Sequence, residues 1–180
     1  MRKYLVGVAV LLLLASSPAP ADEGVTPILK MDTTYHFMFF SQNTPAASLP
    51  GRSAALWAFA WEGTVKGDLN GVIRWWVELP SSSVGRWEIW DCEPVYPASD
   101  CNDPAKLIMA GYDVFASTTE SGSEWAGKGI VTYVGAAYLE EFGGWYGHRI
   151  TDGGSVDYVG GFPSYGEGWF TIYNRPSNKH

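Results

Sequence analysis

The sequence predicts an all-β domain, and three observations support this fold class. Apolar and polar residues alternate with a period of two in several segments, as they do in strands with two distinct faces. Trp, Tyr and Phe together make up 15% of the chain, and aromatic residues favour strands. The 21 glycines fall largely between or at the ends of these segments, where glycine marks turns and bulges.

Eight segments carry the strand pattern, and we expect them to be the strands of one domain. They span residues 35–40, 56–65, 71–79, 86–90, 107–117, 124–134, 145–150 and 166–173. The second and third should form a hairpin, because Asn70-Gly71 favours the positive backbone dihedrals of a tight turn. One short helix is expected at 136–142, since Gly143 and Gly144 follow it and glycine commonly ends a helix.

Eight antiparallel strands must protect the edges of their sheet. A closed barrel removes the edges, whereas a sandwich hides them only in part. We therefore predict a single eight-stranded antiparallel β-barrel, with a β-sandwich as the alternative. In this scheme residues 22–54 form an N-terminal segment with the first strand, 55–174 form the body of the barrel, and 175–180 form a frayed tail.

Residues 1–21 have the pattern of a cleavable signal peptide. Arg2 and Lys3 give it a positive start, an apolar run follows, and the small residues Ala19 and Ala21 precede the expected cleavage site. The apolar run is shorter than the roughly 20 residues that span a bilayer. We therefore expect a secreted or periplasmic protein that is cleaved after Ala21 and has no membrane attachment.

Cys92 and Cys101 are the two cysteines of the chain. An exported chain meets an oxidising environment, so a disulfide between them is expected. The loop that it would close contains two prolines and no apolar periodicity. A zinc site is the alternative, but two cysteines without a nearby histidine do not match the spacing of zinc ligands.

Composition argues against several classes of partner. The net charge of the chain is −7, and it becomes −9 when the two basic residues of the leader are removed. An acidic surface repels phosphate groups, which disfavours nucleic acid and anionic membranes as partners. Four acidic residues surround the predicted disulfide: Asp91, Glu93, Asp100 and Asp103. Their spacing is not that of a calcium-binding loop, so no metal or other cofactor is predicted.

The stretches WEGTVKGDLNGVIRWWVE at 61–78, RWEIWD at 86–91, GKGIVTYVGAAYLEEFGGWYGHRI at 127–150 and GEGWFTIYN at 166–174 form a series of strands and glycine turns. This series resembles the allene oxide cyclase-like barrel group, which includes plant dirigent proteins and small exported bacterial relatives. The resemblance implies an eight-stranded barrel with a central cavity, and cofactor-free cyclisation or stereochemical guidance of reactive intermediates. It is carried mostly by glycine and turn positions, and no cyclase catalytic set maps onto this chain.

Glu62, Glu88 and His148 are the residues that the sequence offers for acid–base chemistry. Carboxylates from neighbouring strands of a barrel can meet in its lumen, and desolvation there would make one a usable acid or base. However, each glutamate lies on the more polar face of its strand, where exposure or an ion pair with Arg74 or Arg86 is the ordinary interpretation. His148 is expected at a strand end, either hydrogen-bonded or exposed.

The strand tryptophans divide between two faces. Four share the apolar face: Trp57, Trp61, Trp75 and Trp87. They are either packed core or the walls of a pocket for a flat hydrophobic ligand. Trp76 and Trp90 share the polar face, where an exposed indole would stack on a sugar ring.

These observations lead to three hypotheses about function. The first is an exported barrel, without an assigned reaction, that binds a hydrophobic small molecule in its lumen. The second is a cofactor-free cyclase or isomerase of the allene oxide cyclase-like type, which requires a buried carboxylate or tyrosine facing an enclosed pocket. The third is a carbohydrate-binding or structural surface module. A lumen packed without any void would argue against the first. The oligomeric state is not determined by the sequence.

Overall fold

The computed structural model describes residues 27–38, 57–78, 83–98, 101, 103–160 and 162–174 of the 180-residue chain. For residues 37–38, 57–60, 77–78 and 162 it describes the backbone alone. The predicted signal peptide at 1–21 and the predicted tail at 175–180 lie outside the described residues.

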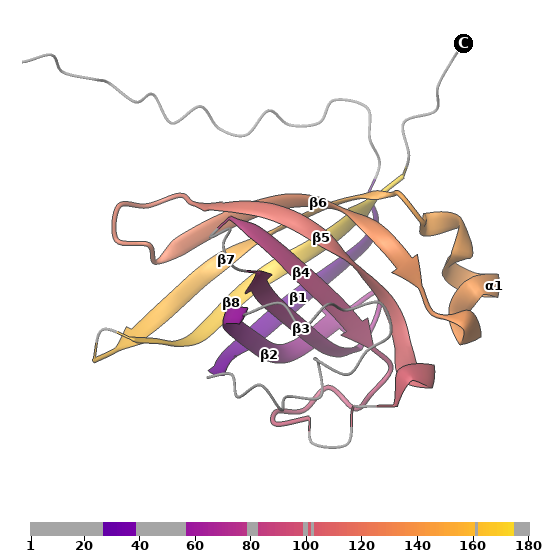
Figure 1. The fold of residues 1–180 in the computed structure, drawn as a ribbon, viewed down its shortest axis with the longest axis horizontal. Helices are drawn as coiled ribbons and strands as arrows, with labels where there is room; N and C mark the ends of the chain where they lie inside the picture. Colours follow the sequence, from indigo (N-terminus) through magenta and orange to yellow (C-terminus); the bar gives the residue numbers. More distant parts are fainter. Residues whose placement is uncertain are drawn as a thin grey trace, which may run out of the picture.

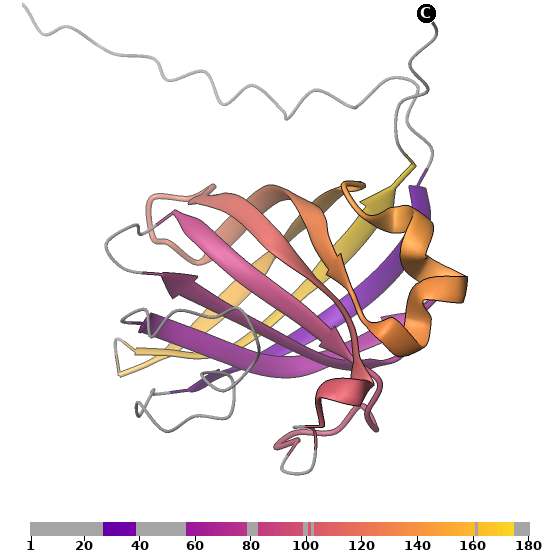
Figure 2. The same ribbon diagram turned by 45° about the vertical axis from the view of Figure 1, so that its right-hand side comes forward.

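Eight strands form one closed antiparallel barrel, as the sequence predicts. The strands are β1 (Pro27–Met38), β2 (Trp57–Gly67), β3 (Gly71–Glu78), β4 (Val84–Trp90), β5 (Leu107–Ser117), β6 (Glu124–Val134), β7 (Arg149–Val159) and β8 (Phe162–Tyr173). Each strand pairs with the next along the chain, and β8 pairs with β1 (Figure 1, Figure 2). This last ladder closes the sheet and removes the edges that a sandwich would leave open.

Two strands differ from their predicted positions. The first begins at Pro27 rather than at residue 35: Leu29-Lys30-Met31-Asp32 alternates, but Thr33 and Thr34 interrupt the apolar pattern before Tyr35. The seventh covers Arg149–Val159 rather than 145–150. Its sequence TDGGSVD has no apolar alternation, since glycine and aspartate occupy most of the positions that face the lumen.

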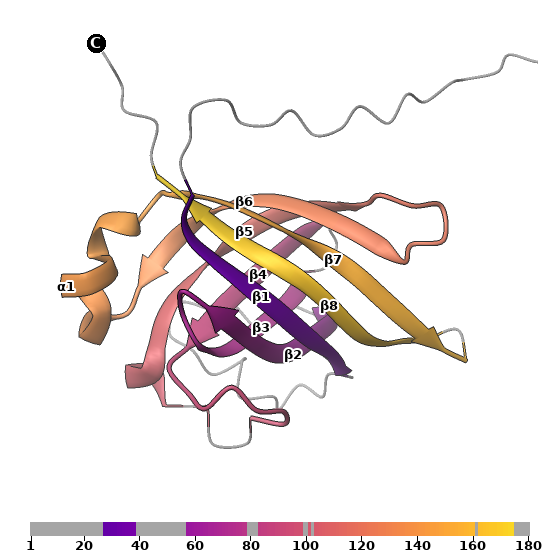
Figure 3. The ribbon, with the colours of Figure 1, turned by 180° about the vertical axis from the view of Figure 1, so that it is seen from behind.

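The two ends of the barrel are built differently. The connection between β6 and β7 contains 3-10 turns at Ala136–Tyr138 and Gly143–Trp145 on either side of the four-residue helix α1 (Leu139–Phe142). It covers one end, which we call the helical end, and the β5–β6 and β7–β8 turns lie at the opposite end, the hairpin end (Figure 1, Figure 3). The buried Phe142 side chain closes the helical end.

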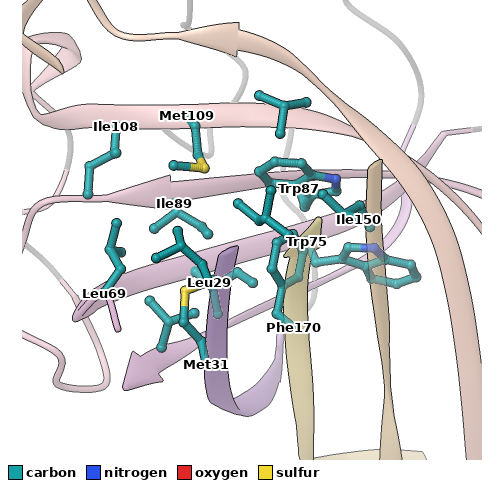
Figure 4. Close-up of a cluster of buried hydrophobic side chains, with 14 of the residues drawn as sticks. Leu29, Met31, Leu69, Trp75, Trp87, Ile89, Ile108, Met109, Ile150 and Phe170 are labelled. Carbon is teal, nitrogen blue, oxygen red and sulfur yellow. The ribbon is translucent and has the colours of Figure 1, made fainter. Parts of the chain in front are cut away.

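The lumen is packed solid from the helical end to the middle of the barrel. Alternate residues of every strand point inward, and their side chains form one cluster (Figure 4). The largest fully buried members of this cluster are Trp87, Phe170, Ile73, Ile89, Met109, Ile150 and Ile172. Trp87 and Phe170 meet edge to face with ring centroids 4.9 Å apart, an arrangement that aromatic pairs prefer.

A second, smaller core lies on the outside of the barrel. The β4–β5 connection folds back over the outer face of β2, β3 and β4, and Val72, Trp90, Ala98, Cys101 and Leu107 pack together beneath it. The Cys92–Cys101 disulfide is formed, with Cα atoms 5.9 Å apart. It fixes the loop over this face, which the two prolines and the lack of apolar periodicity would otherwise leave weakly restrained.

Candidate functional site

Inward-facing glycines provide room in the half of the lumen nearest the hairpin end. A Cβ atom on Gly85 would lie 2.7 Å from the Trp75 indole, and one on Gly111 would clash with the Trp87 indole. The bulky indoles of β3 and β4 therefore occupy space that their neighbours leave empty. This large-beside-small pattern explains how a narrow barrel accommodates several tryptophans.

A cavity of about 160 Å³ opens above this level, at the hairpin end. Its walls are Tyr35, Trp61, Trp75, Phe115, Ser117, Gly122, Trp125, Val156, Tyr158 and Gly166. The Trp75 ring meets Phe115 edge to face at 4.6 Å and lies 6.0 Å from Trp125, and Tyr35 meets Trp125 edge to face at 6.0 Å. These ring contacts make the walls of the cavity one continuous aromatic surface.

Hydrogen bonds join the two hairpins at the mouth of the cavity, and one of them runs from the backbone N–H of Val156 to the carbonyl oxygen of Ser123 at 2.7 Å. The Tyr158 hydroxyl, on β7, donates to the carbonyl oxygen of Gly122 in the β5–β6 turn at 3.2 Å. Tyr158 is about half exposed, so this bond can break without exposing a buried polar group. The cavity is therefore accessible from solvent through the hairpin end.

The four tryptophans predicted to line a ligand pocket fall into different positions. Trp61 and Trp75 line the cavity. Trp87 is fully buried in the packed core below it. Only the backbone of Trp57 is described, so its assignment lies outside the described side chains. Trp125 lines the cavity as well, although it was not among the tryptophans predicted to do so.

Two aspartates lie side by side directly beneath the cavity. Asp113 occupies the inward position of β5 next to the cavity-lining Phe115, and Asp152 points inward from β7. Gly127 on β6 separates them in the sheet: a Cβ there would clash with Asp152 Oδ1 and lie 3.1 Å from Asp113 Oδ2. Gly85 on β4 leaves the matching space on the other side of Asp113. Gly85 is directly opposite Asp113 and Gly127 is directly opposite Asp152, whereas Asp113 itself pairs with Gly129 on β6.

The two carboxyl groups are buried, each about 1% exposed. The Trp75 indole N–H donates to both oxygens of Asp113 at 3.1 Å. Neither oxygen of Asp152 accepts a hydrogen bond from the described residues. The charge of Asp113 acts on Asp152, so a proton on either carboxyl lowers the cost of burying the pair.

This environment favours the protonated form of the pair. Burial raises the pKa of Asp113 to about 6, and the hydrogen bond from Trp75 acts in the opposite direction. Burial and the charge of Asp113 raise the pKa of Asp152 well above its usual value. Because adjacent carboxylates in a low-dielectric site resist ionising together, the pair holds one proton near neutral pH.

Tyr35 connects the pair to the cavity. Its ring lines the cavity wall, and its hydroxyl pKa is raised by burial and by the charge of Asp152. The hydroxyl therefore stays protonated as a hydrogen-bond donor. Together Tyr35, Trp75, Asp113 and Asp152 form a polar floor under an aromatic cavity.

The sequence reasoning missed both aspartates, although a signal was present. Asp113 comes two residues after Gly111 and four after Met109, so it lies on the same inward-facing side of an apolar strand. A charged residue is rarely buried in such a position without a reason. The inward position of Asp152 could not be predicted, because β7 has too few alternating apolar residues to show which of its side chains face the lumen.

The predicted acid–base candidates lie away from the cavity. Glu62 and Glu88 are buried, 5% and 3% exposed, but on the outer face of the barrel beneath the β4–β5 loop, so neither meets a carboxylate in the lumen. The predicted cross-strand ion pair is confirmed, since Arg74 Nε donates to Glu62 Oε2 at 2.8 Å. The backbone N–H of Ala98, in the loop, donates to the other oxygen of Glu62 at 3.0 Å.

His148, Trp76 and Trp90, the other residues selected from the sequence, are buried away from the cavity. His148 is buried just before β7 at the helical end, where its carbonyl accepts from the N–H of Val131, far along the barrel from the cavity. Trp76 and Trp90 are each 1% exposed, so the expectation that they offer exposed rings to a sugar is wrong. The alternation of residues along the strands does not show that the β4–β5 loop covers this face.

The acidic residues around the disulfide act as hydrogen-bond acceptors where they are described. Asp91 accepts from the Tyr138 hydroxyl at 2.8 Å, and Asp103 accepts from the N–H of Ala105 at 2.9 Å. Asp100 lies outside the described residues.

In the part of the chain that the structure describes, no three His, Cys, Asp or Glu side chains are grouped as metal ligands. Within the same residues no helix has the length and apolar character needed to cross a bilayer.

We compared the chain with protein-family models, with curated proteins and with solved structures, and none of them matches it.

Proposed function

We propose that this protein is an exported β-barrel that binds a small hydrophobic ligand in the cavity at the hairpin end. The observation that carries the proposal is a cavity of about 160 Å³ whose lining residues include six aromatic residues and Val156. An apolar cavity of roughly 150 Å³ is large enough to hold benzene. The expected ligand is therefore a flat molecule of about one ring, stacked against the indoles. The disulfide supports export, because such bonds persist in oxidising compartments.

Filling the cavity tests this proposal. Binding of toluene and indole, two ring-sized probes, would be measured by calorimetry. Val156→Phe places a ring in the cavity and should weaken binding at least about 10-fold, since the ligand loses its space. Val114→Phe is the matched control, because Val114 lies on the outer face of β5 and is 61% exposed. It should bind as the unmodified protein does.

Two results would overturn the proposal. One is the absence of saturable binding of either probe to the unmodified protein. The other is unchanged affinity in Val156→Phe with a native near-UV circular dichroism spectrum. Native mass spectrometry of protein from its own host would then identify any ligand that co-purifies.

The aspartate pair supports a second candidate, a cofactor-free isomerase. An ionised carboxylate beside a protonated one can remove a proton from carbon and return it at another position. The pair lies under the Trp75 indole, which also lines the cavity. A substrate would therefore reach the pair when that indole moves aside. The resemblance to the allene oxide cyclase-like group points to the same class of chemistry and remains a prediction.

Conversion of 3-cyclohexenone to 2-cyclohexenone is a suitable assay, because the substrate is ring-sized and the conjugated product absorbs in the ultraviolet. The step moves one proton from the carbon next to the carbonyl to the far carbon of the double bond, with no net change in atoms or electrons. Asp152→Asn should abolish turnover while leaving toluene binding intact. Turnover that is absent in the unmodified protein, or equal in the variant, would exclude this substrate class.

A further inference from the structure

Trp169 forms a platform on the outer surface of the barrel. Its side chain points outward from β8 and is 43% exposed. Across the sheet it pairs with Asp32 on β1 and with Gly153 on β7, and Gly153 pairs in turn with Ala126 on β6. The indole therefore has a glycine and then an alanine beside it in the direction of β6.

Gly153 determines how the indole lies. A Cβ atom at this position would be 2.9 Å from Trp169 Cζ2 and 3.1 Å from Cε2. Contacts this short mean that the indole rests directly on the β7 backbone, and any side chain at residue 153 would displace it. One face of the ring is thus supported by the sheet, and the exposed part of the ring is held in a fixed orientation.

Polar side chains surround the platform. In the next row of the sheet Glu167 pairs with Ser155, and Ser155 pairs with Glu124. All three are exposed. With Asp32 and Trp169 they border a shallow groove of about 610 Å³, larger than the cavity in the lumen. In the row on the other side, exposed Lys30 and Lys128 flank Thr171 and Thr151.

We propose that this groove binds a neutral glycan, with one pyranose ring stacked on Trp169. A pyranose has an apolar C–H face that suits an aromatic ring, and a rim of hydroxyl groups. Carboxylates accept hydrogen bonds from hydroxyls strongly, and Glu167 and Asp32 lie on two sides of the ring. Ser155 supplies a group that both donates and accepts.

The surroundings favour a neutral sugar over an ionic ligand. Acidic side chains lie along one side of the indole and lysines lie one row away on the other side, so the groove has no uniform charge. Sites for organic ammonium ions commonly enclose the cation among several rings, whereas this groove is open. Its second tryptophan, Trp125, also lines the lumen cavity, but Trp169 lines only the groove, so a glycan stacked on Trp169 does not require a ligand in the lumen.

Affinity electrophoresis in gels that contain soluble glucan, mannan, galactan or chitin oligomers tests the proposal. The unmodified protein should be retarded by at least one of these polymers. Trp169→Ala should raise the dissociation constant at least about 10-fold, and Gly153→Val should weaken binding similarly while Trp169 is retained. Tyr133→Ala is the matched control, because Tyr133 is an equally exposed aromatic residue, 46%, on β6. It should leave retardation unchanged, as should Val156→Phe in the lumen.

Three outcomes would overturn the inference. They are no retardation in any of the gels, equal retardation of Trp169→Ala and the unmodified protein, and binding of tetramethylammonium in place of glycans. The last result would identify the groove as an organic-cation site.

Discussion

A rise in pH should destabilise the barrel through Asp113 and Asp152. Both groups are buried, and both have a pKa above that of a solvated aspartate. An acid with a raised pKa in the folded state contributes stability that is fully present below its unfolded pKa. That contribution is lost as the pH rises through the folded pKa. The window for Asp113 therefore extends from its unfolded value of 3.8 to about 6.

The magnitude follows from the shift. One pKa unit corresponds to about 1.36 kcal/mol, so the rise of Asp113 from 3.8 to about 6 lowers the free energy of unfolding by about 3 kcal/mol across this window. Asp152 acts in the same direction at higher pH. Residues in ion pairs, such as Glu62 with Arg74, oppose this trend, so the effect must be isolated by substitution.

The Asp113→Asn variant isolates the contribution of Asp113 to the pH dependence of stability. Its amide keeps an acceptor for the Trp75 N–H and cannot ionise. Urea unfolding followed by tryptophan fluorescence would be measured at about pH 4 and at about pH 7. Relative to the unmodified protein, the variant should gain about 3 kcal/mol between the two pH values. Asp157→Asn, an exposed position on the same strand as Asp152, should show no such gain. A variant whose pH dependence matches that of the unmodified protein would refute the reasoning.

Three further predictions concern packing and cross-links, and the same urea curves measure them. Gly85→Ala should lower the free energy of unfolding by about 1–3 kcal/mol, because its Cβ would press on the Trp75 indole. Gly144→Ala, with nothing within 4 Å of its Cβ, should be neutral, and equal losses in both would contradict the packing argument. Glu62→Gln should destabilise by about 3 kcal/mol, because it leaves the buried Arg74 without its ion-pair partner; a neutral outcome would mean that water reaches this face. Reducing the disulfide should cost about 2–3 kcal/mol for a closure of this length, and an unchanged midpoint would show that the loop is held by packing alone.

The fold is observed in the structure, whereas the family resemblance and the export of the protein are predictions. The eight-stranded barrel that the resemblance implies is present, but a barrel is shared by many unrelated functions and does not establish membership of a family. Residues 1–21 lie outside the described residues, so both the signal peptide and its cleavage after Ala21 remain predictions. Sequencing the N-terminus of the protein from its host would test it.

The candidate site could be predicted only in part. Parity placed Trp61 and Trp75 on the inner face, and both line the cavity. The sequence also indicated Arg74 or Arg86 as ion-pair partners for the strand glutamates, and the hairpin register places Arg74 opposite Glu62. Asp152 could not be predicted, because a strand with few apolar residues does not show which of its side chains face inward.

Local pattern by itself indicated most of the strands, the hairpin, a short helix and the cysteine pairing, because each depends on residues that are close in the sequence. It did not indicate the start of β1 or the extent of β7. Tertiary structure decided which faces are covered. The β4–β5 loop buries Trp76 and Trp90 on a face that parity marks as outer, and no local pattern specifies where a loop will fold back. Closure of the barrel brings Asp113 and Asp152 together from strands that are not neighbours, across the space that Gly127 leaves open. Burial and pKa depend on such non-local contacts, so the aspartate pair appears only in the folded chain, whereas a hydrophobic ligand in the lumen is already suggested by the tryptophans of the apolar face.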